Sequence, residues 1–311
     1  MKIAVLGYGI QGRAQSLNLR DSGHDIVIGN INDKYSKKAK KDGFHVYSIK
    51  DAVKKSKVIM ILLPDEVQER IINNNIIPNL QINSCIVFAH GYWLTFNKKN
   101  IPKNVDILMI APRSPGEQIR KYYTDGHGVP AYIHVVRNVS GKAQNILNKL
   151  VKSLGFDKGG LIKLSYDKET KIDLMIEQVM APIFFGSVQS VFRELVNRGF
   201  PAEVVCLELY YSGELGDVRT MMGRDGLYTA FKNNASPTCQ FGVASSISRV
   251  WKKNMDKIVK LQLERIENGK FAKELKNYDT KKTIDTFINS KIAKKIKITE
   301  KKVSKKINKR W

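Results

Sequence analysis

Residues 2–12 read Lys-Ile-Ala-Val-Leu-Gly-Tyr-Gly-Ile-Gln-Gly, and this stretch decides the fold. A short apolar run ends in a turn whose glycines, Gly7, Gly9 and Gly12, follow the spacing G-x-G-x-x-G. In a dinucleotide-binding turn, the first glycine permits a tight bend and the second lets the backbone approach a pyrophosphate. The third lets the following helix pack on the strand. The pattern alone is a weak signal, and an ordinary glycine turn is the alternative.

The sequence around the turn favours the dinucleotide-binding interpretation. A polar, helix-compatible segment, Arg13–Arg20, follows it, and Ser22-Gly23 ends that segment before a second apolar run at Asp25–Gly29. This order of strand, turn, helix and strand is the context that the motif requires. We therefore expect the residues of the turn to contact a dinucleotide: Gly7, Tyr8, Gly9, Ile10, Gln11 and Gly12.

Strand-like runs recur along the first half of the chain, separated by polar segments of helix length. They lie at Lys2–Leu6, Asp25–Ile28, Val58–Leu63, Ser84–Phe88, Ile107–Ile110 and Ala131–Val136. This alternation is typical of an α/β fold with a doubly wound parallel sheet. We therefore predict an N-terminal Rossmann-type domain.

From about Lys168 the pattern changes to long helical periods. They lie at Glu169–Arg198, Pro201–Met222, Ile247–Asn268 and a final basic stretch. The glycine-rich segment Gly155–Gly160 lies near the change, although the last strand could extend to Leu164. We predict a dinucleotide-binding domain at residues 1–165 and an all-helical domain with a basic tail at residues 166–311, and the candidate metal and substrate groups considered below assign the second domain to metal and substrate.

Length and composition are those of a globular protein. A chain of 311 residues can bury two cores, and its hydrophobic content is 42%. It contains no run of about 18 apolar residues and does not begin with a signal peptide, so we expect a cytoplasmic protein without membrane association. Cys85, Cys206 and Cys239 are too scattered for a disulfide framework or a zinc site.

The formal net charge of +24 raises the question of nucleic-acid binding. Much of it lies in residues 252–311, which hold 20 Lys and Arg against 7 Asp and Glu. Most of the cations are lysines, whereas bidentate recognition of bases and phosphates favours arginine, and no aromatic residues are interleaved for base stacking. We interpret the tail as a solvated, lysine-rich surface. A positive field also suits phosphorylated cofactors and anionic substrates.

The end of the second strand bears on the choice of nicotinamide cofactor. A carboxylate there holds a ribose 2′-hydroxyl, whereas basic and hydroxyl groups accept a 2′-phosphate. Asn30 stands where the acid is expected, and Ser36 has lysines around it at positions 34, 37 and 38, although Asp33 argues for NAD. The sequence favours NADP(H) over NAD(H).

Candidate reactive groups follow the third, fourth and fifth strands. In an open parallel sheet, ligands bind beyond the carboxyl ends of the strands, so His90 and the backbone around Pro64 are expected to face the nicotinamide. His90 has either a proton-handling or a structural role. Arg113 lies in the rigid turn Ala111–Gly116, where it either binds a carboxylate or forms a surface ion pair.

The helical half offers candidate metal ligands. Asp173 and Glu177 are four residues apart and would project from one face of a helix among apolar neighbours. Magnesium bound through oxygen ligands would offset their charge, although the spacing alone also fits a solvated acidic face. Glu208 and Glu214 are six apart, roughly 240° around a helix, so at most one of them is a good ligand.

In this order, these motifs resemble those of ketol-acid reductoisomerase, in its shorter class, over nearly the whole chain. The blocks that carry the resemblance are Gly7–Gly12, Leu63–Gln68, Phe88–Gly91, Met109–Pro112, Gly126–Pro130, Ser140–Lys142, Asp173–Gln178 and Glu264–Leu275.

The resemblance implies an enzyme of branched-chain amino-acid biosynthesis. It would bind two Mg²⁺ ions, migrate an alkyl group of a 2-hydroxy-2-acyl acid such as 2-acetolactate, and reduce the product with NAD(P)H to 2,3-dihydroxyisovalerate. By this resemblance Asp173 would bridge the metals, Glu177 would bind one of them, and His90 would lie close to cofactor and substrate. It also implies a homodimer or higher homo-oligomer. Further cofactor contacts are assigned to Ser36, Asp65, Glu66, Val67, Gln68 and Gly116.

The chain departs from the family pattern at four places, and one of them is the cofactor loop, where an arginine common in the family is absent near Ile31. Arg113 replaces a lysine, which keeps the charge but changes reach and hydrogen-bond geometry. Where the family has two glutamates four residues apart, this chain offers either Glu208 followed by Ser212 or, in a shifted register, Glu214, and we assign Glu208 as the third metal ligand. Ser236 is kept as a catalytic substrate contact in a block that has lost its acid.

These departures leave two alternatives to the complete activity. The first is a 2-keto acid reductase with a changed substrate and without the isomerase step. The second is a cofactor-binding homologue without catalysis.

Overall fold

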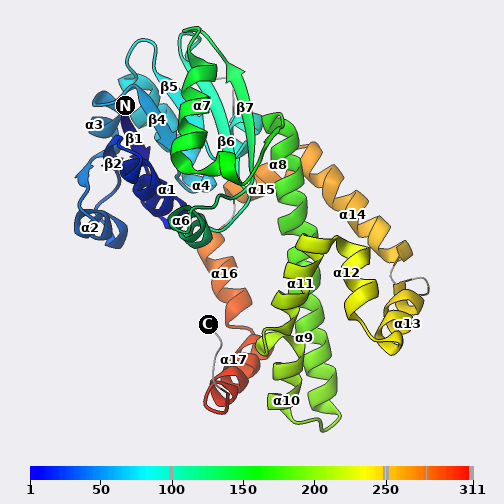
Figure 1. The fold of residues 1–311 in the computed structure, drawn as a ribbon. Coiled ribbons are helices and arrows are strands. Elements are labelled where there is room, and N and C mark those ends of the chain that lie inside the picture. The colour runs from blue at the N-terminus through cyan, green and yellow to red at the C-terminus, as the bar shows by residue number, and fades with distance from the viewer. Residues whose placement is uncertain (98–100, 248, 250–251, 278, 308–311) are drawn as a thin grey trace. The chain divides into compact units, whose positions relative to one another are not determined.

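The computed structural model describes residues 1–97, 101–247, 249, 252–277 and 279–307. The chain divides into two compact units, Met1–Asp173 and Leu174–Trp311 (Figure 1). The division falls inside a helix, beyond the boundary predicted at 165/166, and that boundary stays a prediction. Residues 248, 250 and 251 of the expected helix Ile247–Asn268, and residues 308–311 of the basic tail, lie outside the described part.

The first unit is built on one sheet of eight strands. They are β1 (Lys2–Leu6), β2 (Asp25–Gly29), β3 (His45–Tyr47), β4 (Val58–Ile61), β5 (Cys85–Phe88), β6 (Asp106–Pro112), β7 (Ala131–Arg137) and β8 (Leu161–Lys163). Their order is β3-β2-β1-β4-β5-β6-β7-β8. Neighbouring strands are parallel except β6 and β7, which pair Ile107 with Arg137 and Pro112 with Ala131. The expected Rossmann-type α/β fold is confirmed, and its sheet is mostly rather than entirely parallel.

In the described part of this unit, eight α-helices accompany the sheet. They are α1 (Ile10–Asp21), α2 (Lys34–Lys41), α3 (Ile49–Lys54), α4 (Asp65–Ile71), α5 (Tyr92–Asn97), α6 (Gly116–Thr124), α7 (Ala143–Leu154) and α8 (Tyr166–Met175, which continues into the second unit). Short helical turns lie at Ile72–Ile76, Ile77–Asn79 and Phe156–Lys158.

Helices cover both faces of the sheet because alternate strand residues point to opposite sides. In β1, Ile3 and Val5 join one core with residues of α1 and α7, such as Leu17 and Leu147. Ala4 joins the opposite core, which includes residues of α3, α4 and α5. The fully buried strands therefore read as continuous apolar runs.

Three features of this sheet differ from the expectation. The sequence predicted six strands, but β3 and β8 also form, each only three residues long. The run that could have extended to Leu164 is the separate strand β8. Finally, β7 is antiparallel to β6. A hydrophobic run indicates that a strand is buried, but it does not indicate whether the strand is parallel or antiparallel to its neighbour.

The second unit is helical, as expected. It contains α9 (Ala181–Asn197), α10 (Ala202–Cys206), α11 (Glu214–Asp225), α12 (Leu227–Asn234), α13 (Pro237–Ser246), α14 (Lys252–Glu267), α15 (Lys270–Asn277), α16 (Thr280–Ile288) and α17 (Lys291–Val303). Two π-helical turns, η5 (Ile176–Met180) and η6 (Leu207–Tyr211), interrupt the expected long helices.

The expectation that Glu208 and Glu214 share one helix is wrong. Glu208 lies in η6, whereas Glu214 begins α11. Between them Gly213 has a φ of +86°, a left-handed conformation that favours glycine and ends the preceding helical turn. The angle of 240° therefore does not describe this pair.

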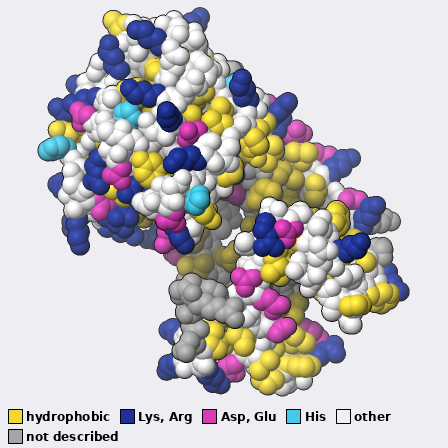
Figure 2. All heavy atoms as spheres, in the orientation of Figure 1, with side chains coloured by type: hydrophobic (Ala, Val, Ile, Leu, Met, Phe, Trp, Pro, Cys, Tyr) yellow, Lys and Arg dark blue, Asp and Glu magenta, His cyan; other side chains and the backbone are white. Residues whose placement is uncertain are grey.

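The second unit leaves many apolar side chains exposed. Its described core cluster includes Phe192, Val205, Cys206 and Val303. Large side chains such as Phe185 (52%), Phe241 (71%) and Tyr228 (81%) are exposed, and hydrophobic side chains gather on the visible surface of this unit (Figure 2). Monomeric proteins rarely expose large apolar patches, so this surface is a candidate for an interaction with a partner.

One helical stretch, Tyr166–Asn197, has the length and composition of a membrane span. Its mean hydropathy reaches 1.2, and 11% of that window is buried. Among the described residues this is the single stretch that meets the criterion, and length and composition alone give weak support for a span. Its N-terminal part also carries Glu169 and Asp173, which form ion pairs.

Candidate active site

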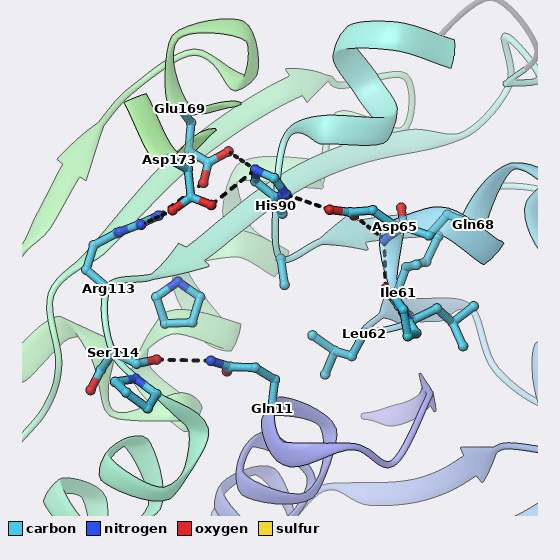
Figure 3. Close-up of a pocket in the computed structure, with 15 residues that line it drawn as sticks. Gln11, Ile61, Leu62, Asp65, Gln68, His90, Arg113, Ser114, Glu169 and Asp173 are labelled. Carbon is cyan, nitrogen blue, oxygen red and sulfur yellow. Dashed lines mark hydrogen bonds and ion pairs between the residues drawn. The ribbon is translucent and has the colours of Figure 1, made fainter. Parts of the chain in front are cut away.

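A cavity of about 540 Å³ lies where the strand order reverses, between β1 and β4 and along the neighbouring strand ends. Ligands of doubly wound sheets bind at this switch point. Side chains from the glycine-rich turn, from the segments after β4, β5 and β6, and from α8 line the cavity (Figure 3). The lining includes Gln11, Leu62, Pro64, Asp65, Gln68, His90, Arg113, Ser114, Glu169 and Asp173.

The glycine-rich turn has the shape that a dinucleotide requires. Gly7 has a φ of +92°. A Cβ on Gly12 would lie 2.0 Å from the Gly7 carbonyl oxygen, whereas a Cβ on Gly9 would meet no atom within 4 Å. Among the described residues, no side chain caps the N-terminus of α1, so its first amides can donate to a ligand. The space over Gly9 and these amides fit a pyrophosphate.

His90 lies in the loop after β5, between carboxylates on two sides (Figure 3). Its Nδ1 is 3.2 Å from Asp65 Oδ2, and its Nε2 is 3.5 Å from Asp173 Oδ2 and 3.7 Å from Glu169 Oε2. Burial alone would lower the pKa of His90, but the Asp65 hydrogen bond and the surrounding carboxylates raise it to about 9. His90 therefore carries a positive charge at neutral pH.

Glu169 is a central member of the cluster that the sequence interpretation missed. Its side chain is 1% exposed. Oε2 accepts a hydrogen bond from the Gly91 amide at 2.8 Å, and Oε1 accepts one from Arg113 Nη1 at 3.1 Å. Burial raises the pKa of the Glu169 carboxyl despite the nearby His90 charge. Glu169 precedes Asp173 by four residues, so the helical spacing that singled out Glu177 also identifies Glu169.

Arg113 joins the two carboxylates of α8. Besides Glu169, its guanidinium donates a hydrogen bond to Asp173 Oδ1, and it lies 5.2 Å from the centre of the Tyr132 ring. Burial lowers the pKa of Arg113, but the bond to Asp173 outweighs this effect and raises it. Arg113 thus forms ion pairs with two carboxylates of the protein itself at the wall of the cavity, and its binding of a substrate carboxylate stays a prediction.

The start of α4 supplies polar groups to the opposite wall. Gln68 Nε2 donates to the Leu63 carbonyl and to Asp65 Oδ1, both at 2.8 Å. Gln68 Oε1 is buried and has no hydrogen-bond partner among the described residues. A ligand with an N–H group would satisfy it. Glu66 and Val67 do not line the cavity.

The turn after β6 packs directly on the glycine-rich turn. Gln11 Nε2 donates to the Ser114 carbonyl at 3.0 Å. A Cβ on Gly116 would lie 2.4 Å from the Ile10 carbonyl oxygen, so only glycine fits there. Gly116 thus supports the turn, and it does not line the cavity.

A second cavity, of about 580 Å³, lies at the carboxyl ends of β2 and β3. Asn30, Ser36, Lys40 and Arg70 are among its lining residues. Ser36 is 3% exposed, and its hydroxyl belongs to the capping box that Asp33 forms at the start of α2. Two cations and three asparagine amides thus line the region predicted to hold the adenosine ribose.

The described residues contain one cluster with the composition of a metal site. Ligand atoms of His90, Glu169 and Asp173 lie within 4.8 Å of one another. Both Glu169 oxygens accept hydrogen bonds, whereas Asp173 uses Oδ1 for Arg113 and turns Oδ2 toward His90. His90 Nε2 is buried and has no hydrogen-bond partner among the described residues. Asp173 Oδ2 is the kind of oxygen ligand that Mg²⁺ takes, whereas a positively charged His90 would not ligate the ion.

The other predicted site residues belong to the second unit. Glu177 lies in η5 and Glu208 in η6. Ser236 is the N-cap of α13, and its hydroxyl accepts the Cys239 amide at 3.3 Å. Their assignments remain predictions.

Two family models together cover most of the chain. The first, described as the NADPH-binding domain of acetohydroxy acid isomeroreductase, matches residues 1–160. The second, the C-terminal domain of ketol-acid reductoisomerase, matches residues 166–309. The order of the two matches is the order in which the sheet and the helices follow one another.

Individual relatives agree with the family models. A ketol-acid reductoisomerase (NADP(+)) of Pyrobaculum aerophilum is 37% identical over 274 residues, which are 88% of this chain and 83% of the relative. The structure of an NADH-preferring ketol-acid reductoisomerase from an uncultured archean has a TM-score of 0.89 and 31% identity, and the match covers 97% of this chain and 94% of that one. A semialdehyde dehydrogenase NAD-binding protein from Cupriavidus necator shares the fold, with a TM-score of 0.62, 15% identity and coverage of 85% and 99%.

Proposed function

The chain belongs to the ketol-acid reductoisomerase family, and from this premise we propose that it catalyses the complete reaction of branched-chain amino-acid biosynthesis. In that reaction 2-acetolactate is rearranged by alkyl migration and reduced by NAD(P)H to 2,3-dihydroxyisovalerate. The observation that carries the proposal is the convergence of His90, Arg113, Glu169 and Asp173 on one cavity beside the dinucleotide turn.

Two bound groups are part of the proposal. NADP(H) is favoured over NAD(H), because Lys40 and Arg70 line the cavity at the ribose end and Asp33 is engaged as a helix cap. The two named ketol-acid reductoisomerases differ in this respect, one being an NADP(+) enzyme and the other NADH-preferring. Mg²⁺ would be held by Asp173, with Glu177 and Glu208 as further ligands. Bound Mg²⁺ would polarise the hydroxyl and carbonyl oxygens of the substrate, and the nicotinamide would supply hydride.

The residues of the cavity each have a defined task in this proposal. His90, charged at neutral pH, holds its Nδ1 proton toward Asp65 and can present Nε2–H to an oxygen of the substrate. Glu169 orients the loop of His90 through the Gly91 amide and orients Arg113 through its guanidinium. Gln68 Oε1 is an acceptor for the nicotinamide carboxamide. Ser236 is proposed as a further substrate contact.

A second candidate function is favoured by one observation. Arg113 stands where the family has lysine, and it engages the same carboxylate, Asp173, that is proposed to bind metal. A guanidinium does not exchange protons at neutral pH, whereas a lysine ammonium can when its pKa is lowered. The chain would then reduce a 2-keto acid without carrying out the isomerisation.

The test is to incubate the purified protein with 2-acetolactate, Mg²⁺ and NADPH, then with NADH, and to identify the product by mass spectrometry. Formation of 2,3-dihydroxyisovalerate supports the complete reaction. Reduction of 3-hydroxy-3-methyl-2-oxobutyrate without turnover of 2-acetolactate supports the second candidate. An Asp173→Asn variant is the control for a contaminating host enzyme, because it should lack the activity.

We also propose a cytoplasmic homodimer or higher homo-oligomer. An apolar groove of about 320 Å³ in the helical unit is lined by residues that include Phe184, Phe185, Phe287, Ile288 and Ile296. A second copy of the chain would remove this surface from water, and the lysine-rich tail would remain a solvated face that does not bind nucleic acid. Light scattering after size-exclusion chromatography tests the assembly; a monomer at micromolar concentration contradicts it.

A further inference from the structure

The glycine-rich turn is tied to its domain through the side chain of Tyr8. The Tyr8 ring is 1% exposed and packs edge-on against Phe44, with ring centroids 5.7 Å apart. Its hydroxyl donates a hydrogen bond to Asp42 Oδ2 at 2.9 Å. Asp42 is the C-cap residue of α2, so the middle of the turn is held by a neighbouring helix.

Asp42 also holds the helix that follows the turn. Arg13, in the second turn of α1, donates from Nε to Asp42 Oδ2 at 2.7 Å and from Nη2 to Oδ1 at 3.3 Å. The hydrogen bond from Arg13 lowers the pKa of Asp42, and burial raises the pKa of Tyr8. Tyr8 precedes Gly9–Gly12, and Arg13 follows them. The ionised carboxylate of Asp42 therefore holds the turn from both sides, through hydrogen bonds that are stronger than those between neutral groups.

The other end of α2 is connected to the same turn. The Tyr8 amide donates to Asn30 Oδ1 at 3.1 Å, and Asn30 Nδ2 donates to Asp33 Oδ1 at 2.9 Å. Asp33 is the N-cap of α2. Tyr8 is thus linked to both ends of one helix: through its amide to the N-terminus and through its hydroxyl to the C-terminus. This closed ring gives Asn30 a role that does not involve the ribose.

We propose that Asp42 is a positioning residue for the dinucleotide, acting through Tyr8 and Arg13 to hold the turn in the shape that receives the pyrophosphate. The inference rests on the proposed function, which supplies the dinucleotide. Asp42 lines neither of the two cavities described above, so its effect passes through the residues that it holds. A turn that is ordered before binding does not lose conformational freedom when the cofactor arrives, and affinity is higher for that reason.

The experiment measures NADPH binding by isothermal titration calorimetry, without substrate or Mg²⁺, for the wild type and for the variants Asp42→Asn and Tyr8→Phe. We expect the Kd of NADPH to rise about five- to tenfold in Asp42→Asn, the size expected when a charge-assisted hydrogen bond is weakened. Asp25→Asn is the control: Asp25 is an exposed carboxylate paired with Lys2, and its loss should leave the Kd within about twofold.

Steady-state kinetics separate positioning from a general loss of structure. In Asp42→Asn the KM for NADPH should rise with the Kd, whereas kcat at saturating NADPH and the KM of the second substrate stay within about twofold. Asp42→Asn and Tyr8→Phe weaken the same hydrogen-bonded connection between Asp42 and the turn. The rise in the Kd of NADPH in the double variant should therefore be smaller than the product of the two single rises. If Asp42→Asn does not fold, Tyr8→Phe, which keeps the buried ring, carries the measurement.

Unchanged NADPH affinity in both variants, or a fall in kcat without a change in Kd, overturns the positioning role while the proposed function stands. Failure of the wild type to bind NADPH or NADH overturns the proposed function and the inference with it. The wild-type titration therefore distinguishes the two failures.

Discussion

Arg113, in the turn after β6, and Asp173, on α8, form a hydrogen-bonded ion pair at the wall of the cavity. The pair places a fixed positive charge on the carboxylate that is proposed to bind Mg²⁺. A divalent cation at Asp173 must therefore share this carboxylate with the guanidinium or displace it. In the proposed site, the arginine would therefore weaken the binding of the metal.

Replacing Arg113 by lysine should strengthen Mg²⁺ binding. Lysine keeps the charge but loses the planar fork that reaches Glu169 and Asp173 together. Release of one hydrogen bond to a charged group, about 1.5 kcal/mol, predicts roughly a tenfold lower Kd for Mg²⁺. Calorimetric titration of the cofactor-free protein with MgCl₂ measures it. Arg198→Lys is the matched control, since Arg198 pairs with Glu194 on an exposed helix face. Equal Mg²⁺ affinities in wild type and Arg113→Lys would contradict the competition.

Replacing Glu169 by glutamine should destabilise the first unit. The amide still accepts the Gly91 N–H but no longer neutralises Arg113 and His90 in a buried position. The expected loss is about 2–3 kcal/mol in the free energy of unfolding. Guanidinium denaturation followed by circular dichroism measures it, with Glu264→Gln, exposed on α14, as a control that should change stability by less than about 0.5 kcal/mol. Wild-type stability in Glu169→Gln would mean that the ion pairs contribute nothing net.

Much of this site follows from the sequence because the carboxyl ends of parallel strands share one edge of a sheet. The expectation that His90 and the backbone around Pro64 lie beyond the same ends of the strands as the glycine-rich turn requires only that β1, β4 and β5 run in one direction, and they do. Glu169 was missed because the resemblance begins its helical block at Asp173, one helical turn later.

Other features leave no clear trace in the sequence. The three-residue strands β3 and β8 are too short to show a periodicity, and they form because the neighbouring strand offers unpaired backbone groups. The π-helical turns at Ile176–Met180 and Leu207–Tyr211 each absorb an extra residue, which the hydrophobic pattern of a helix does not reveal. The number of residues from Asp173 to Glu177, or from Glu208 to Glu214, therefore does not give the angle between their side chains around the helix axis.

The same added methyl group should have different effects at two glycines of the turn. At Gly12 it should lower stability, and at Gly9 it should lower the affinity for NADPH. In Gly12→Ala the Cβ would lie 2.0 Å from a backbone carbonyl, so α1 and β1 must separate. We expect a loss of at least about 1–3 kcal/mol in the free energy of unfolding. In Gly9→Ala, where φ is −70° and the space is open, stability should be unchanged, but NADPH affinity should fall at least about tenfold because the methyl occupies the path of the pyrophosphate.

Thermal denaturation and NADPH titration of both glycine variants give this comparison. Gly186→Ala, on α9, is the control for the methyl group itself: nothing lies within 4 Å of its Cβ, and the helix should gain about 0.5–1 kcal/mol. A Gly9→Ala protein that binds NADPH normally would show that the pyrophosphate does not lie over this turn.

Stability should depend on the ionisation of Asp42. The hydrogen bond from Arg13 keeps the pKa of Asp42 in the folded protein below its unfolded value of about 3.9. Its contribution is therefore complete above about pH 4 and is lost as the pH falls through the folded pKa. The difference in unfolding free energy between the wild type and Asp42→Asn, from urea denaturation at pH 7 to 3, should shrink toward acid. A constant difference across this range would contradict the link to ionisation.

The reversed strand β7 has a practical consequence for such measurements. Because β7 is antiparallel to β6, it ends at Arg137, beside Ile107 at the start of β6. The segment that follows therefore leaves the sheet at the opposite end of the strands from His90 and Arg113. Asp106 fixes this segment by accepting the amides of Val139 and Ser140, and the next residues are exposed. A fluorophore or a surface-immobilisation tag attached there would leave the cofactor side clear, so the protein could report nucleotide binding while fixed to a sensor.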